Sequence, residues 1–163
     1  WNPQFISNAA NLWAAVQYGV PTAGLEWLWL GIAAAGAASI LFVIVFHRLD
    51  GTPTHLIALA LLSAMLLPFL LPKMHERFFF LADALALAFL ALRRDRLGWA
   101  VFLLVETASA AALVGVLYRL PLPPVLGGVM MLAAILIVAR SLVYGSQAKK
   151  EYGPLSLGRL DLA

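Results

Sequence analysis

Long apolar runs separated by short polar segments dominate this chain. A helix needs about 20 apolar residues to cross the ~30 Å hydrocarbon core of a bilayer. Gly- and Pro-containing turns such as Gly51-Thr52-Pro53 divide the chain between such runs. Five runs approach the required length, at residues 27–46, 55–71, 78–92, 97–118 and 124–144. The pattern predicts an all-α fold, a polytopic transmembrane helix bundle of about five spans.

The chain divides into three parts by polarity. Residues 1–26 are only moderately apolar, and Trp13 and Tyr18 are typical of the aromatic belt of a membrane interface. We therefore expect a partly helical extracytoplasmic interfacial segment over 1–26. A five-helix transmembrane bundle follows over 27–144, and a polar cytoplasmic tail over 145–163.

Composition excludes several classes of protein. Hydrophobic residues make up 63% of the chain, charged residues only 12%, and the mean hydropathy is +0.92. A soluble globular domain carries about 25% charged residues, so this chain is neither soluble nor disordered. It has no cysteine, which excludes disulfides and thiolate sites. The net charge of +3 comes from scattered residues, so no nucleic-acid partner is expected.

The basic residues predict the orientation of the bundle, because Lys and Arg concentrate on the cytoplasmic side. Short connections make successive helices antiparallel, so the two ends can be counted separately. One end collects Arg48, Arg93, Arg94, Arg96, Arg140, Lys149, Lys150 and Arg159, and the other has only Lys73, Arg77 and Arg119. We expect an integral membrane protein with a cytoplasmic C-terminus.

Small residues recur where helices could approach one another closely. Gly31, Ala35 and Ser39 lie four residues apart, and Ser109 and Gly115 lie along the fourth span. Close packing is the usual reason for such residues in membrane helices, so they indicate a packed bundle. No His pair lies at helical spacing inside a span, so we expect no haem or chlorophyll ligands. The sequence indicates no metal site, and it leaves any other cofactor unknown.

Ionisable residues inside membrane spans are costly and suggest function. Asp83 and Glu106 lie within predicted spans, whereas Arg140 lies near a helix end and can extend to the interface. Glu106 lies about 18 Å from the outer end of its helix at 1.5 Å per residue, so we expect no pairing with Asp83. It either bonds to another helix or faces a partner.

The densest polar group is Lys73-Met74-His75-Glu76-Arg77, between Pro72 and three phenylalanines. If the following helix extends back through this segment, Glu76, Phe80 and Asp83 share one face. The carboxylates of Glu76 and Asp83 would then lie ~10 Å apart along one groove.

Two interpretations of this cluster remain open. Its cations could hold a phosphate attached to a lipid, because Arg supplies a planar fork of donors, Lys a point charge and His a pH-dependent donor. Phe78, Phe79 and Phe80 would then guide an acyl or isoprenoid tail. Alternatively, the segment is a short loop whose basic residues contact phospholipid headgroups.

The segment from Leu71 to Asp83, LPKMHERFFFLAD, resembles an outer-loop motif of bacterial GT-C-type, mannosyltransferase-like membrane glycosyltransferases. Upstream, residues 8–13, NAANLW, resemble the Asn-Ala-Tyr-Asn-Leu-Trp stretch of the same group. The resemblance covers about the first 90 residues. Two departures replace a usual tyrosine, with Phe78 in the first motif and Ala10 in the second.

The resemblance implies sugar transfer from a polyprenyl-phosphate donor on the extracytoplasmic face of a bacterial inner membrane. Lys73, His75 and Arg77 would hold the donor phosphate, and Glu76 and Asp83 would order the site. Asn8 and Asn11 complete the candidate substrate-binding set. The catalytic carboxylates of these enzymes lie in a first outer loop that has no counterpart here, so we identify no catalytic residue.

The sequence therefore favours the C-terminal portion, or a truncated relative, of such a glycosyltransferase, this part binding the lipid phosphate. The chain begins at Trp1 rather than Met, from which we expect a fragment, a processed product or an incompletely assigned chain. Its expected partners are membrane lipids and a polyprenyl-phosphate-linked sugar. The alternative is a non-catalytic transmembrane subunit that packs against other subunits of a respiratory or photosynthetic complex.

Overall fold

Helices form all the regular structure of the residues described. A computed structural model describes residues 10–19, 25–47, 51–72, 74–120 and 122–152. The elements are α1 (Leu12–Gly19), α2 (Leu25–Phe46), α3 (Pro53–Leu70), the 3₁₀ helix η1 (Glu76–Phe79), α4 (Phe80–Arg93), α5 (Arg96–Tyr118) and α6 (Leu122–Tyr152). The predicted all-α membrane helix bundle is confirmed.

Four of the helices, α2, α3, α5 and α6, are long and apolar enough to cross a membrane. The third predicted span, residues 78–92, is shorter, because α4 has 14 residues and is only ~21 Å long at 1.5 Å per residue. The four residues of η1 add ~8 Å at the 2.0 Å rise of a 3₁₀ helix. Together they form a helical stretch close to the thickness of the hydrocarbon core.

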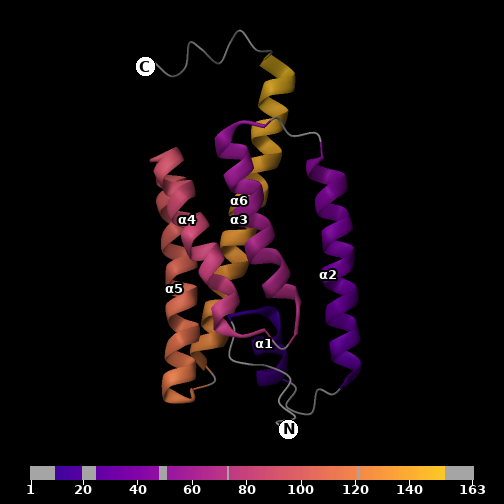
Figure 1. The fold of residues 1–163 in the computed structure, drawn as a ribbon, viewed down its shortest axis with the longest axis vertical. Helices are drawn as coiled ribbons and strands as arrows, with labels where there is room; N and C mark the ends of the chain where they lie inside the picture. Colours follow the sequence, from indigo (N-terminus) through magenta and orange to yellow (C-terminus); the bar gives the residue numbers. More distant parts are fainter. Residues whose placement is uncertain (1–9, 20–24, 48–50, 73, 121, 153–163) are drawn as a thin grey trace.

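The long helices lie side by side, and the short α1 lies across one end of the bundle (Figure 1). We call this the α1 end; it also holds η1, the last turns of α3 and α5, and the first turns of α2 and α6. The opposite end holds the turn between α4 and α5, and we call it the α4–α5 end. The sequence predicts that the α1 end faces outward.

The core lies among α3, α4, α5 and α6. Phe89 of α4, Leu61 of α3, Val105 of α5 and Val138 of α6 are all fully or almost fully buried there. Helix α2 stands to one side and packs on α3. The ring of its Trp27 packs edge to face on the ring of Trp13 in α1, with 6.4 Å between the ring centres. The bundle is thus four central helices with one peripheral helix.

Local signals explain where the helices begin and end. Thr52 caps α3 by accepting a hydrogen bond from the His55 N–H at 3.3 Å, and Pro53 occupies the first helical position, where its missing N–H costs nothing. Arg94 and Arg119 follow α4 and α5 in the left-handed conformation, with φ of 50° and 53°. Helix ends commonly adopt this conformation, although glycine is the usual residue.

The predicted close-packing positions are confirmed at two glycines. A Cβ on Gly31 would lie 2.6 Å from Cδ of Pro72, and a Cβ on Gly115 would lie 2.5 Å from Cγ of Pro124. Neither position has room for a larger side chain. By contrast, nothing lies within 4 Å of a Cβ built on Gly36 of α2.

The exterior of the bundle is apolar along its length. Ile40 and Ile44 of α2, Leu117 of α5 and Leu136 of α6 are each 60% or more exposed. Water would not tolerate so large a continuous apolar surface, whereas lipid solvates it. The fold is that of an integral membrane protein.

Candidate functional site

The LPKMHERFFFLAD segment forms the turn from α3 into α4 at the α1 end. Helix α3 stops at Leu70, and Pro72 is buried. His75 is extended, with φ −87° and ψ 156°, and η1 begins at the next residue. The described residues of the predicted cluster, Met74 to Arg77, therefore lie directly before and within a helix.

The upstream NAANLW motif completes the end of α3. The last carbonyl groups of a helix have no partner within it. The Trp13 indole Nε1–H donates to the Leu70 carbonyl at 2.5 Å, and the Asn11 Nδ2 donates to the Leu71 carbonyl at 3.4 Å. These bonds join residues 57 and 60 positions apart. The two motifs that carry the family resemblance are therefore in direct contact.

Asn11 is the only polar residue among the described ones that is fully buried. Its Oδ1 accepts from the Ala14 N–H at 3.1 Å, which is the N-cap bond of α1. Both ends of its amide therefore bind main-chain groups. Asn11 acts on the site through the chain it holds in place. Asn8, the other predicted asparagine, lies outside the described residues.

Trp13 is not the interfacial belt residue that the sequence predicts. Only 2% of it is exposed, and its ring lies against the position where a Cβ on Gly31 would be, 2.8 Å from Cζ2. The ring thus fills the space between α1, α2 and the end of α3. A tryptophan side chain is large enough to reach inward from a short helix, which the sequence pattern does not distinguish from outward placement.

The three phenylalanines divide into one anchor and two surface residues. Phe79 is fully buried in the core, whereas Phe78 and Phe80 are 52% and 62% exposed. The prediction that all three guide a lipid chain is therefore wrong for Phe79. Its burial fixes η1 to the bundle and turns Phe78 and Phe80 toward the surroundings.

The cations of the cluster lie at the surface of this turn. His75 and Arg77 are exposed. Lys73 and the Glu76 side chain lie outside the described residues. Exposed cations on an ordered turn at the membrane boundary can bind a phosphate that arrives through the interface, because charged hydrogen bonds to phosphate are among the stronger ones.

The predicted shared face of Glu76, Phe80 and Asp83 stays a prediction, because the Glu76 side chain lies outside the described residues. Residues 76–79 form a 3₁₀ helix, which turns about 120° per residue instead of 100°. Within α4, Phe80 is 62% exposed and Asp83 is half-buried.

Asp83 has a partner on the neighbouring helix. The Ser109 hydroxyl of α5 donates to Asp83 Oδ1 at 2.6 Å. Glu106 lies one turn from Ser109 on α5. The bond from Ser109 gives Asp83 a partner inside the bundle, and the expectation that Asp83 does not pair with Glu106 stays a prediction.

Sequence reasoning missed the roles of Trp13 and Ser109. Trp13 stands two residues after Asn11 in the upstream motif, which was the available signal. Ser109 stood out only as a small residue, although an aspartate within a span needs a donor nearby. Within the ranges that the structure describes, no three His, Cys, Asp or Glu side chains are grouped to hold a metal ion.

Comparisons with known proteins assign no family to this chain. No family model, curated protein or solved structure matches the chain.

Proposed function

We propose that the chain is the C-terminal portion, or a truncated relative, of a GT-C-like membrane glycosyltransferase that uses a polyprenyl-phosphate sugar donor. In this proposal the turn at the α1 end binds the phosphate of the lipid. The chain acts on the extracytoplasmic face of a bacterial inner membrane, with the C-terminus cytoplasmic.

One observation carries the proposal. Asn11 of the first motif bonds to the carbonyl of Leu71, which opens the second motif, and Trp13 bonds to the carbonyl of Leu70 just before it. The resemblance treats the two motifs as parts of one site, and their contact in the fold supports that reading. A chance likeness of two short segments would not require them to meet.

The chemistry of the turn suits a phosphate at the end of a long apolar chain. His75 and Arg77 offer donors at the surface, with Lys73 two positions earlier in the sequence. Phe78 and Phe80 offer apolar rings beside them for the first isoprene units. Asp83 is engaged by Ser109 and lies deeper, so it orders the helix behind the site.

The proposed role is binding without catalysis. Sugar transfer needs a base within hydrogen-bond reach of the acceptor. Asp83 is engaged in the bundle, and the family's catalytic carboxylates belong to a different outer loop. Sugar transfer by residues 1–163 alone would contradict this part of the proposal.

The test is binding of a polyprenyl monophosphate to the full chain in a neutral detergent, followed by native mass spectrometry. The matched polyprenyl alcohol is the ligand control, and Arg119→Asn, which removes a cation outside the motif, is the protein control. We expect preference for the phosphate, and about a tenfold or greater loss in Arg77→Gln, because a bond to a charged group contributes ~1.5–3 kcal/mol. Equal binding of phosphate and alcohol would contradict the proposal.

The subunit function is a second candidate, and helix α2 favours it. This helix packs on α3 and carries an open face with Trp29 65% exposed and free space at Gly36. Small residues on an open face permit close approach of another helix. Purification at a fixed ratio with other membrane subunits would favour this candidate, and recovery as a free monomer would count against it.

A further inference from the structure

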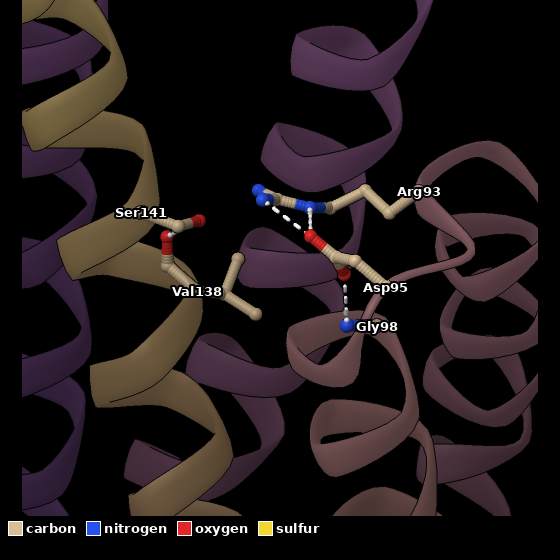
Figure 2. Close-up of polar contacts among 5 residues, drawn as sticks. All are labelled: Arg93, Asp95, Gly98, Val138 and Ser141. Atoms are coloured by element: carbon tan, nitrogen blue, oxygen red, sulfur yellow. Dashed lines mark hydrogen bonds and ion pairs between the residues drawn. The ribbon is translucent and has the colours of Figure 1, made fainter. Parts of the chain in front are cut away.

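The α4–α5 end carries a turn of four charged residues, Arg93 to Arg96. Arg93 is neutralised within the turn, because its Nε and one terminal nitrogen bond to the same Asp95 oxygen at 3.0 and 2.8 Å. Figure 2 shows the Arg93 side chain lying across the Asp95 carboxylate. The second Asp95 oxygen accepts from the Gly98 N–H at 2.8 Å and caps α5. Asp95 thus has both oxygens occupied.

Three further arginines at this end have no carboxylate partner among the residues that the structure describes. Arg94 and Arg96 flank Asp95, and Arg140 lies in α6 one turn before Tyr144, where the apolar span of that helix ends; all three are exposed. Arg94 donates from Nε to the Ala91 carbonyl at 3.1 Å, a bond that uses one of the five N–H donors of its guanidinium group. Asp95 cannot compensate them, since Arg93 and Gly98 already occupy it.

The backbone at Arg94 decides which substitution can test its side chain. Its φ of 50° and ψ of 22° belong to the left-handed region, where glycine is the least strained residue and asparagine is tolerated.

Aromatic residues place these arginines at the level of the lipid headgroups. The Arg140 guanidinium lies 5.1 Å from the centre of the Tyr144 ring, and Tyr144 is 59% exposed. Trp99, 54% exposed, follows Arg96 by one turn. Exposed Trp and Tyr concentrate at membrane interfaces. On α6 nearby, Ser141 donates to the Val138 carbonyl of its own helix at 2.8 Å (Figure 2), so its hydroxyl is already engaged.

We propose that Arg94, Arg96 and Arg140 form a binding surface for the headgroups of anionic phospholipids. One guanidinium group can donate two parallel hydrogen bonds to a phosphate. Three arginines without a carboxylate partner among the described residues favour a headgroup with net negative charge over a zwitterionic one. The surface lies at the opposite end of the bundle from the polyprenyl-phosphate turn. This proposal does not depend on the proposed function of that turn.

Trp99 supplies a local probe, because it is the only tryptophan after Trp29 in the sequence. The full chain is placed in mixed micelles of phosphatidylcholine and brominated phosphatidylglycerol, whose bromine quenches indole fluorescence on contact. Subtracting the spectrum of Trp99→Phe isolates the signal of Trp99. We expect this signal to be quenched more strongly by brominated phosphatidylglycerol than by brominated phosphatidylcholine at the same mole fraction.

The arginines are then removed as Arg94→Asn, Arg96→Gln and Arg140→Gln, with asparagine chosen because it tolerates the left-handed conformation. Each removal should lower the preference for phosphatidylglycerol roughly fivefold. Arg119→Asn is the matched control, since Arg119 has the same backbone conformation at the other end. If the variants in the α4–α5 turn fail to fold, Arg140→Gln alone carries the test.

The outcomes are distinct. Loss of preference in the arginine variants with none in Arg119→Asn supports the surface. Equal quenching by both lipids in the unchanged chain would overturn the proposal. So would an equal loss in Arg119→Asn, because net charge and not this surface would then be responsible.

Discussion

The two ends of the bundle complete their helices in different ways. At the α1 end, the final carbonyls of α3 accept hydrogen bonds from Trp13 and Asn11, 57 and 60 positions away in the sequence. At the α4–α5 end, Asp95 bonds to Arg93 and Gly98, two and three positions away. One end depends on tertiary contacts, and the other is closed by its own turn.

This difference determines what each end can offer to a ligand. Long-range closure buries Asn11 and Trp13 and holds the His75–Arg77 turn in place, which suits a site for a defined molecule. Closure at the α4–α5 turn pairs Arg93 with Asp95, the acid of that turn, and leaves Arg94 and Arg96 exposed at the surface. That arrangement suits headgroups that exchange freely.

The largest effect is expected for Trp13→Ala. The substitution removes a buried ring and the donor to the Leu70 carbonyl, so the free energy of unfolding should fall by about 3–5 kcal/mol. Trp29→Ala is the control, because Trp29 is 65% exposed and should change stability little. Unfolding in mixed detergent micelles measures both. Equal losses would show that the α1 end is not closed by Trp13.

A smaller loss is expected for Gly128→Ala in α6. A Cβ at this position would lie 2.9 Å from the Asn11 carbonyl oxygen, and main-chain atoms cannot move aside easily. The free energy of unfolding should fall by about 1–3 kcal/mol. Gly36→Ala makes the same chemical change in open space and should be neutral or slightly stabilising. A neutral Gly128→Ala would contradict the close contact of α1 with α6.

The bond between Asp83 and Ser109 is expected to contribute less. Hydrogen bonds between membrane helices average about 0.6 kcal/mol, with a maximum near 1.7. A double-mutant cycle with Asp83→Ala and Ser109→Ala should give a coupling energy in that range. Asp83→Ala with Ser63→Ala is the reference pair, since Ser63 bonds within its own helix to the Ala60 carbonyl. Its coupling should be zero.

The smallest effect concerns charge at the α4–α5 end. Partial burial acts to raise the pKa of Asp95, but the bonds from Gly98 and Arg93 and the Arg93 charge lower that pKa below 3.8 overall. A lowered pKa contributes stability above the unfolded-state value, and this contribution is lost as pH falls through the folded-state value. The side chain is 42% exposed, so the gain is under ~1 kcal/mol.

Asp95→Asn tests this directly, because asparagine caps a helix about as well as aspartate. Thermal unfolding in a neutral detergent should show the variant slightly less stable at pH 7, and the difference should shrink as pH falls below 3.8. A stability difference that persists at low pH would show that the cap, and not the charge, is responsible.

The sequence predicts most of the fold because apolar length fixes it. The predicted runs match the helices to within a few residues, except that α6 continues past Tyr144 to Tyr152 and the third run divides into η1 and α4. Hydropathy cannot detect that division, because a 3₁₀ turn and an α-helical turn have the same composition. The division of the third run into η1 and α4 depends on Phe79, whose side chain is buried in the core.

The site is less predictable. Charge and motif order identify His75, Arg77 and the upstream asparagines, but they do not show which polar groups meet. The partners of Asn11 and Trp13 are main-chain carbonyls, which have no sequence signature. Ser109 becomes the partner of Asp83 only once α4 and α5 are side by side. Tertiary packing supplies these contacts.

The most direct test of the account is to locate a bound polyprenyl phosphate. A polyprenyl monophosphate with a photoreactive group on its first isoprene unit is added to the full chain in neutral lipid nanodiscs, irradiated, and its attachment mapped by peptide mass spectrometry. The account predicts attachment around Phe78 and Phe80 at the α1 end, reduced in Arg77→Gln. Attachment concentrated around Trp99 at the α4–α5 end, or spread evenly along the bundle, would contradict it.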